Sequence, residues 1–436
     1  MKVKQVKKDG NDVVLEAVAT PQDVAKVLQF AQEGFANSMG LMPEKGKTVA
    51  QVAEEKMGIK NLDQIVANEA AAALVPMALD KRDIIPAYMP KVESGGTLER
   101  GKEYRFKLSV ALRPEYELTS YDPVTVEAVK FSVDESAVQA ELDNMRQQYT
   151  AYVKDESADA DHVVAPGDFV KIAIEATGED GKPFRGLSTT GRTYAVGAGH
   201  MPEGFDSQVQ GMKVGEKKSI SFDGPSFDDD FNETTERVDA DVEILELLVE
   251  QTPEIDDEWV SKSMPWFKTA EELKTSIRKS IEVSQRESYD AYIRQAVAAE
   301  WAKRFQGKIA DEVYENMMVQ LRDGIRADLH RQGQDWDQFV EQNGGESNVS
   351  MMLMMQAREV IVQGYALDAV FRHFGLVATD SDYDQVCHAM NPQADPRQLR
   401  EQIELRGQGF ALRESAERYK ANVYAVEHAD INYVEE

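Results

Sequence analysis

Cysteine is almost absent from this chain of 436 residues, which contains only Cys387. A single thiol excludes an internal disulfide framework and suits a reducing compartment. Cys387 stands next to His388, and adjacent residues on a helix do not share a face, which disfavours a metal pair there. The six histidines show no ligand spacing. The sequence therefore predicts no metal and no cofactor.

Basic residues are in the minority: 49 lysines and arginines face 78 aspartates and glutamates, giving a formal net charge of −29. Nucleic-acid binders contact phosphates with clustered Lys and Arg, so this balance argues against a general nucleic-acid binder. A local basic tip on an acidic body remains compatible with it.

Long apolar runs are also missing. The longest, Ala70–Leu79, is about half the length needed to cross a bilayer and contains Pro76. The opening residues MKVKQVKKDG carry charge with no apolar run behind them, so we expect no secretory signal. These features predict a cytoplasmic protein that does not enter membranes.

Residues 1–113 follow the pattern of an N-terminal α+β domain within a chain long enough for two or three domains. Apolar residues alternate on both sides of Asp9-Gly10-Asn11, which is typical of two paired strands. They then recur at helical spacing after Pro21. Further expected elements are helices at Thr48–Lys56 and Asn61–Leu79 and strands near Ala87–Lys91 and Tyr104–Leu112.

Residues 114–164 are predicted to connect this domain to the next. Ser132-Val133-Asp134-Glu135 has the form of a capping box at the start of a helix. The acidic run from Asp155 to Asp161 indicates a solvated hinge.

Residues 166–248 have a β-rich pattern that resembles the FKBP-type peptidyl-prolyl isomerase domain. Alternating apolar residues and an Asp-Gly turn predict a hairpin near its start. A glycine-containing loop and a Gly-Met-x-x-Gly-Glu-Lys turn follow at the spacing of that family. The matching segments are Thr177-Gly178, Asp180-Gly181, Gly197–Phe205, Gly211–Lys217 and the final strand at Val242–Leu247.

The resemblance implies a peptide-binding pocket in this domain, but several residues depart from the family's catalytic pattern. Ala176, Arg192 and Ala240 stand where the family has aromatic residues, and Arg185 replaces an acidic one. Pro202 falls where the family presents a backbone N–H to substrate, and proline has none. We therefore expect weak or absent isomerase activity and assign no catalytic residue. The retained pocket residues are Phe184, Tyr194, Met201, Phe205 and Phe231.

The chain after Pro253 is predicted to be helical to its end. Thr269-Ala270-Glu271-Glu272 forms a further capping box, and apolar residues recur at four-residue steps from Ile309 to Leu329. A methionine-rich helix near 351–374 and a last helix near Gln398–Val426 follow. Apolar faces wider than one helix needs suggest extended arms rather than a compact bundle.

The predicted fold class is α+β multidomain, with an N-terminal α+β docking domain, an FKBP-like β-rich insert and a long-helix C-terminal domain with arms. The predicted domains are 1–113, a connector strand and helix at 114–164, the FKBP-like domain at 165–250, and the helical domain at 251–436.

This domain order resembles bacterial trigger factor, the ribosome-associated chaperone family. Gly46-Lys47 followed by Gly58 keeps the spacing of that family's docking loop, although Pro43-Glu44-Lys45 and Val49 depart from its residues. The resemblance implies that Lys45, Gly46 and Lys47 contact the ribosome. Lysines can bind phosphate or carboxylate, and glycine permits close backbone approach. The alternative is an ordinary solvated loop with two lysines.

A methionine cluster is the second feature that suits a chaperone. Methionine is flexible and polarizable, and so fits a surface that accepts many clients. Ordinary core packing of a helix explains the cluster equally well. The residues assigned to client-binding arms are Met317, Leu321, Met351, Met352, Leu353, Met354 and Met355.

The resemblance implies an ATP-independent chaperone that holds unfolded or nascent polypeptides at the ribosomal exit tunnel, with a possible homodimer when free. One alternative is an active peptidyl-prolyl isomerase whose helices recruit substrate. Another is a holdase or assembly factor independent of ribosomes, which the altered loop would permit.

Overall fold

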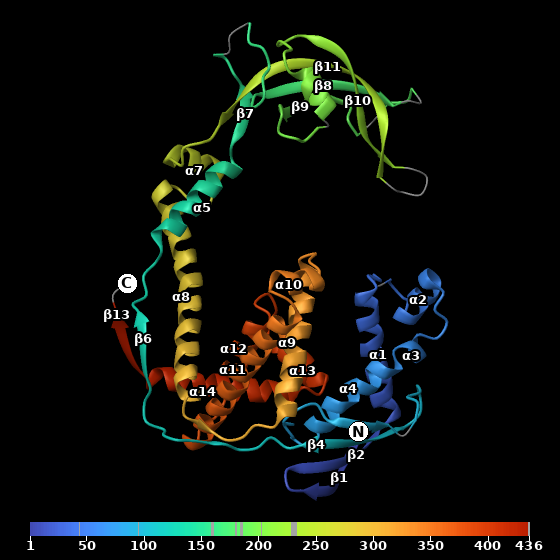
Figure 1. Ribbon diagram of the computed structural model, residues 1–436, viewed down its shortest axis with the longest axis vertical. Coiled ribbons are helices and arrows are strands. Elements are labelled where there is room, and N and C mark those ends of the chain that lie inside the picture. The colour runs from blue at the N-terminus through green and yellow to red at the C-terminus, as the bar shows by residue number, and fades with distance from the viewer. Residues whose placement is uncertain are drawn as a thin grey trace. The chain divides into compact units, whose positions relative to one another are not determined.

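The computed structural model describes residues 1–42, 44–94, 96–157, 161–178, 181–183, 186–201, 203–227 and 233–434. The chain forms two compact units. The first unit combines Met1–Phe131 with Ser288–Glu436, and the middle unit is Ser132–Glu287. Figure 1 shows the elements of both units. No helix within the described ranges is long and apolar enough to span a membrane.

The N-terminal part of the first unit contains a four-stranded antiparallel sheet in the order β1-β2-β4-β3. Asp9 pairs with Asp12 across Gly10, whose φ of 60° is left-handed, so the predicted hairpin is confirmed. Alternate residues of β2 are buried. The strands are β1 (Lys2–Asp9), β2 (Asp12–Ala19), β3 (Lys91–Ser94) and β4 (Tyr104–Ala111).

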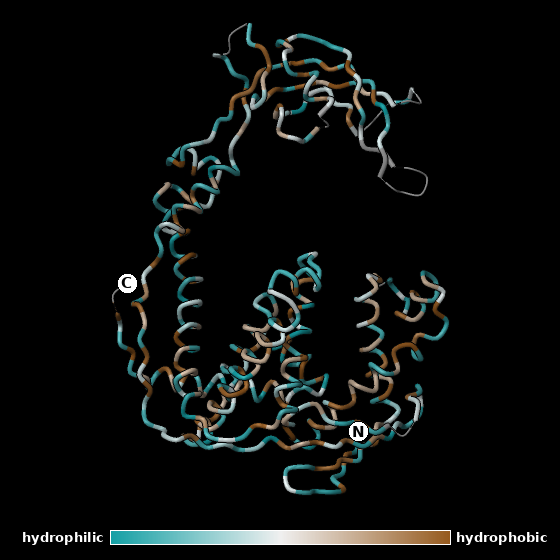
Figure 2. Tube along the Cα trace, viewed as in Figure 1, coloured by the Kyte–Doolittle hydropathy of each residue, from teal (hydrophilic) through white to brown (hydrophobic). Residues whose placement is uncertain are grey.

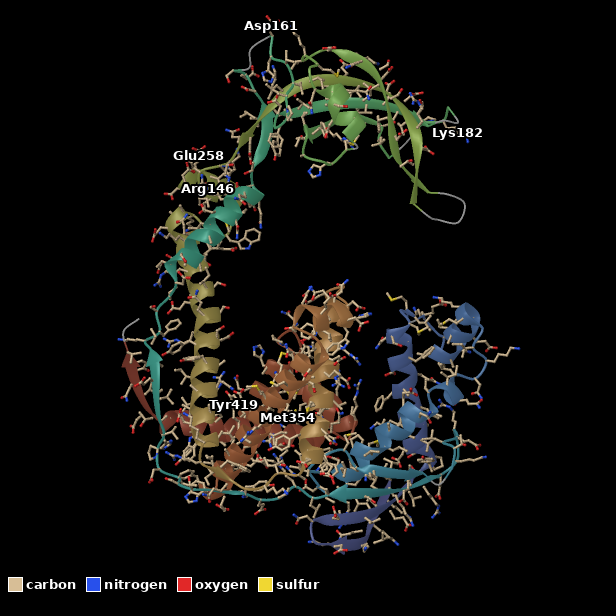
Figure 3. All side chains as sticks on the ribbon, in the orientation of Figure 1. Arg146, Asp161, Lys182, Glu258, Met354 and Tyr419 are labelled. Atoms are coloured by element: carbon tan, nitrogen blue, oxygen red, sulfur yellow. The ribbon has the colours of Figure 1, made fainter. Side chains whose placement is uncertain are left out.

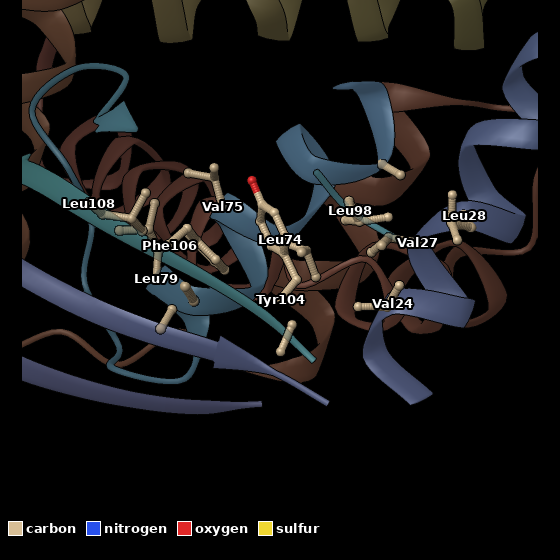
Figure 4. Close-up of a cluster of buried hydrophobic side chains, with 14 of the residues drawn as sticks. Val24, Val27, Leu28, Leu74, Val75, Leu79, Leu98, Tyr104, Phe106 and Leu108 are labelled. Atoms are coloured by element: carbon tan, nitrogen blue, oxygen red, sulfur yellow. The ribbon is translucent and has the colours of Figure 1, made fainter. Parts of the chain in front are cut away.

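Four helices accompany this sheet. Thr20 and Asp23 form a capping box at the start of α1, and Thr48 and Gln51 form another at α2. Apolar side chains of α1 and α4 pack with those of β2 and β4 in one core (Figure 4). The helices are α1 (Pro21–Ser38), α2 (Val49–Met57), α3 (Leu62–Ile65) and α4 (Ala67–Asp80).

Two predicted elements of this part need correction. The single helix expected at Asn61–Leu79 is divided into α3 and α4 at Val66, where the backbone leaves the helical region. The strand expected near Ala87–Lys91 begins only at Lys91. Pro86 instead forms an isolated bridge with Leu112, so proline limits pairing there.

The C-terminal part of the first unit is helical. The helix α11 packs against α9 and α14, and α14 also packs against α12 and α13. Thus the helices predicted as separate arms share three apolar clusters. The helices are the end of α8 (Ala270–Ala302), α9 (Asp311–Arg331), α10 (Trp336–Gln342), α11 (Glu346–His373), α12 (Asp380–Met390), α13 (Pro396–Leu405) and α14 (Gly409–Glu427).

The last helix was predicted as one segment, and the structure shows two. Gly407 lies between α13 and α14 with a φ of 73°, and a side chain there would collide with the backbone of Met77 on α4. The helix α12 was not predicted, although Thr379 and Asp382 form a capping box at its start.

Two short strand pairs complete the first unit. The strand β12 (Phe305–Gln306) pairs antiparallel with β5 (Glu117–Leu118). The strand β13 (Asp430–Val434) pairs parallel with β6 (Thr125–Val129). Since each pair joins segments far apart in sequence, periodicity alone could not reveal it.

The middle unit contains the predicted β-rich domain. Its antiparallel sheet has the order β10-β11-β8-β9, and β7 pairs with the end of β11. Hydrophobic and hydrophilic residues alternate along these strands (Figure 2). Its elements are α5 (Glu135–Gln148), β7 (Ala151–Lys154), β8 (Phe169–Gly178), β9 (Thr189–Ala195), α6 (Glu203–Val209), β10 (Lys217–Phe227), β11 (Glu233–Gln251), α7 (Asp257–Ser263) and the start of α8.

An ion-pair network joins the two parts of the first unit. Arg113, which follows β4, contacts Asp368 of α11 and Glu414 of α14. Arg418 of α14 binds the same two carboxylates at 2.9 and 2.6 Å. The guanidinium of Arg113 also lies 4.9 Å from the ring centre of Tyr365. Charges this poorly exposed need such partners, because desolvation of an unpaired charge is costly.

Asp368 should make stability depend on pH. Burial raises the pKa of Asp368 to about 7, and the charge of Arg113 opposes the rise. An unfolded aspartate ionises near pH 4, so between roughly pH 4 and pH 7 only the folded chain keeps this proton, and stability falls as pH rises. When the pH is raised from about 5 to about 8, we expect the free energy of unfolding to fall on the order of 2 kcal/mol more in the wild type than in Asp368→Asn. Urea unfolding at both pH values measures this.

The exposed Asp323 of α9 provides the control for this experiment. Asp323→Asn should keep the pH dependence of the wild type. Equal pH dependence in the wild type and Asp368→Asn would contradict the assignment.

Candidate functional site

The lysines of the predicted docking loop lie at a tight turn before α2. Gly46 has a φ of 83°, and the backbone N–H of Lys47 donates to the carbonyl of Glu44 at 3.1 Å. The Lys47 ammonium contacts Glu44 at 3.0 Å and also contacts Glu55. Lys56 contacts the other oxygen of Glu44 at 2.9 Å. Gly46 therefore adopts the left-handed backbone conformation of this turn, which glycine reaches without a steric cost.

The two loop lysines differ in how much of their charge is already paired. Hydrogen bonds to Glu55 and Glu44 raise the pKa of Lys47, and hydrogen bonds from Lys56 and Lys47 lower the pKa of Glu44. Lys45 is exposed and forms no ion pair with any described residue. Pro43 lies outside the described residues. Lys45 is thus the better placed of the two to contact an external anion.

A polar groove of about 700 Å³ lies beside this loop. The Asp63 carboxylate in its wall receives two hydrogen bonds from Arg100, at 2.6 and 2.8 Å, and one from Gln32 at 2.6 Å. Lys60 also lines the groove. The surface around the loop therefore mixes both signs of charge.

The predicted pocket residues of the middle unit lie in its core. Tyr194, Met201 and Phe205 are all buried. The Tyr194 and Phe205 rings meet edge to face with centroids 5.6 Å apart, and Phe205 meets Phe222 in the same way at 5.4 Å. The structure thus brings three of the five predicted residues together. Phe184 and Phe231, and likewise Arg185 and Pro202, lie outside the described residues.

Arg192 brings a charged side chain into contact with this cluster. A guanidinium nitrogen of Arg192 lies 3.2 Å from the sulfur of Met201. The buried Tyr194 hydroxyl has no hydrogen-bond partner among the described residues. Ala176 and Ala240 are buried in the same core and supply only methyl groups. These two positions therefore add no aromatic surface to the cluster.

The methionine cluster on α11 divides between surface and core. Met351 and Met355 are 62% and 68% exposed, and Met354, labelled in Figure 3, is 43% exposed. Met352 is 37% exposed. Leu353 is fully buried, which corrects its prediction as a client-binding residue. It points to the opposite side of α11 because neighbouring helix positions are about 100° apart.

Met317 and Leu321 of α9 are partly buried and pack on a core cluster formed with α11. The structure therefore places them between helices, with only part of each side chain available to a client. Core packing thus accounts for Leu353 and in part for Met317 and Leu321, and the exposed methionines stay candidates for client contact.

A groove of about 720 Å³ begins at Met355 and runs between α8, α9 and α11. Val362 of α11 and Tyr314 of α9 line it, and Lys303 and Arg358 supply positive charge. Glu359 in its wall accepts hydrogen bonds from Gln295 and Gln363 at 2.9 and 3.1 Å. We name the exposed Met351, Met352, Met354 and Met355, together with the lining of this groove, the methionine face. It contains both apolar and polar side chains.

Comparison with known proteins decides the family. A sequence profile described as bacterial trigger factor protein matches residues 1–145, and one described as its C-terminus matches residues 269–427. A profile for FKBP-type peptidyl-prolyl cis-trans isomerase matches residues 161–226. The chain belongs to the trigger factor family. Its middle unit therefore carries the FKBP-type domain of a trigger factor.

Relatives named trigger factor align with this chain over its full length. The trigger factor of Geobacillus kaustophilus (strain HTA426) is 25% identical over 436 residues, covering 99% of this chain and all of the relative. That of Desulforudis audaxviator (strain MP104C) is 27% identical over 444 residues, covering 99% of this chain and 98% of the relative. A solved trigger factor chaperone structure is 19% identical with a TM-score of 0.39, covering 98% of this chain and 99% of that one.

A third groove of this trigger factor was not predicted from sequence. It has a volume of about 390 Å³ and lies where α8, α11, α12 and α14 meet. Met390 and Tyr419 line it, and Tyr419 is labelled in Figure 3. The unpredicted helix α12 supplies one wall, so the groove could not be inferred without that helix. The capping box at Thr379 was the available signal.

Proposed function

We propose that this trigger factor is an ATP-independent chaperone that holds newly made polypeptides at or near the ribosomal exit tunnel in the cytoplasm. The methionine face is the observation that carries the proposal. Exposed, flexible thioethers adapt to many apolar sequences. Apolar burial contributes roughly 25 cal/mol per Å² before ordering costs, so a client covering a few hundred Å² would bind weakly and leave again.

Removing the exposed methionines should impair holding without unfolding the chain. We expect Met351→Ser, Met354→Ser and Met355→Ser together to reduce suppression of aggregation several-fold. The measurement is light scattering of a chemically denatured globular protein diluted into buffer without ATP. The melting temperature should change little, because surface substitutions usually alter stability by less than about 0.5 kcal/mol.

Met42 and Met57 are exposed on the N-terminal part and provide a matched control. Their double replacement by serine should leave suppression unchanged. Full activity of the triple variant would overturn the role of the methionine face.

We expect the docking loop to contact the ribosome mainly through Lys45. Lys47 is already paired with Glu44 and Glu55. Replacing Lys47 therefore removes less unpaired positive charge than replacing Lys45. We expect Lys45→Ala to reduce co-sedimentation with ribosomes several-fold at low salt, and Lys47→Ala to reduce it less. The difference should shrink as salt rises, because exposed charges are screened.

Lys8 of β1 is exposed and lies outside the loop, so Lys8→Ala is the control. If Lys45→Ala co-sediments as well as the wild type, the loop is not the contact. If the wild type itself does not co-sediment, a holdase that works without ribosomes becomes the better description.

We further propose that the FKBP-type domain is a weak isomerase that binds or spaces peptides. Support comes from Arg192 beside Met201 and from the alanines at 176 and 240. Uncatalysed X-Pro rotation takes tens of seconds, and we expect the full chain to accelerate it only a few-fold in a protease-coupled peptide assay. Turnover comparable with efficient isomerases would contradict this and favour the alternative of an active enzyme.

A further inference from the structure

The C-terminal strand β13 has one paired edge and one open edge. It pairs in parallel with β6, and these two strands form a sheet by themselves among the described residues. Figure 1 shows β13 beside β6 near the C-terminus. An unpaired strand edge presents a row of backbone donors and acceptors that can pair with another extended chain.

The register identifies which residues of β13 face outward. The N–H of Asp430 donates to the carbonyl of Val124 at 2.9 Å, so Asp430 directs its backbone groups toward β6. Backbone direction alternates along a strand, and therefore Asn432 also faces β6. Ile431 and Tyr433 must then direct their N–H and C=O groups away from β6. The carbonyl of Val129 in β6 accepts a hydrogen bond from Tyr289 at 2.7 Å, on the side away from β13.

Two other edge strands, β1 and β10, carry features that block such pairing, and β13 has none of these features. The strand β1 contains four lysines and a register irregularity between Gln5 and Lys7. The strand β10 contains two lysines and Pro225. Lysine, proline and bulges are the usual protections of exposed edges. The sequence of β13, Asp-Ile-Asn-Tyr-Val, lacks lysine, arginine and proline.

The side chains around this edge indicate what would pair with it. Tyr433 and Val434 are 58% and 44% exposed, so one end of β13 offers apolar surface. Glu127, Asp430 and Glu427 are exposed, and none of them forms an ion pair with a described residue. An added strand would therefore meet apolar side chains and negative charge together.

We propose that the open edge of β13 binds an extended segment of client polypeptide rich in apolar and basic residues, which adds a third strand to the β6–β13 sheet. This inference rests on the proposed holding function and assigns it a second contact. Main-chain hydrogen bonds give affinity without demanding a particular sequence. Such a contact suits a chaperone that meets many different chains.

Proline at position 433 tests the proposal, because it removes an outward N–H and leaves the ladder to β6 intact. The matched control is Tyr433→Ala, which loses the same ring and keeps the N–H. The probe is a labelled peptide of alternating valine and lysine, about as long as a typical strand. With the full chain, we expect Tyr433→Pro to bind this peptide roughly tenfold more weakly than Tyr433→Ala in fluorescence anisotropy.

Two further peptides keep the test decisive even if Tyr433→Pro folds poorly. A peptide N-methylated at alternate amides should bind the wild type roughly tenfold more weakly, because it cannot complete the ladder. A valine–glutamate peptide should also bind more weakly, because of the nearby carboxylates. Wild-type binding that ignores N-methylation would overturn the proposal.

Other outcomes separate this inference from the proposed function. If Tyr433→Pro and Tyr433→Ala bind equally while the methionine variants lose holding activity, the edge proposal fails alone. If the wild type neither binds peptide nor suppresses aggregation, the holding function fails with it. If the wild type is a dimer that Tyr433→Pro converts to monomer in analytical ultracentrifugation, a second copy occupies the edge, and the client proposal is overturned.

Discussion

The first unit depends on how the helix α11 is buried. One end of α11 is buried almost all round, and the other end is buried on one side only. From Ile361 to Val370 most of its residues are buried, even Gln363 and Gly364. From Val349 to Ala357 only every fourth residue is buried. The first pattern is that of a core helix and the second that of an amphipathic one. Packing at the buried end thus holds the other end in place with methionines exposed.

The buried end of α11 can contain charge because its neighbours supply partners and space. Asp368 binds both Arg113 and Arg418. Arg418 crosses α11 at Gly364, where a Cβ atom would lie 2.7 Å from its guanidinium carbon. Removing one partner of such a network commonly costs about 3–5 kcal/mol, because the other charges stay buried. The network therefore fixes how the N-terminal sheet and the helices meet within the first unit.

Sequence patterns predicted the local elements well and the long-range ones poorly. The hairpin at Gly10 and the helices predicted after Pro21 and from Thr48 depend on neighbouring residues, so their signals are visible in the chain. The division of the last helix depends on contact between Gly407 and Met77, and the β6–β13 pair joins Thr125–Val129 to the distant Asp430–Val434. Contacts of this kind leave no periodic signal.

The same limit applies to the candidate site. Methionine composition indicated an adaptable surface, but only packing shows that Leu353 faces the core and Met355 faces a groove. Lys45 and Lys47 are alike in sequence, and the carboxylates around Lys47 distinguish them. Residue type thus predicted which kinds of side chain could bind a partner. The fold decides which individual side chains of each kind are exposed and unpaired.

Weak contacts of different kinds suit the proposed role of a chaperone that releases its clients without ATP. A thioether surface recognises apolar side chains and tolerates many shapes. A strand edge recognises backbone, which every unfolded chain possesses. Each contact alone gives modest affinity, because ordering a flexible client offsets much of the gain. Two such contacts on one client raise its effective local concentration, so holding strengthens while either contact can still open.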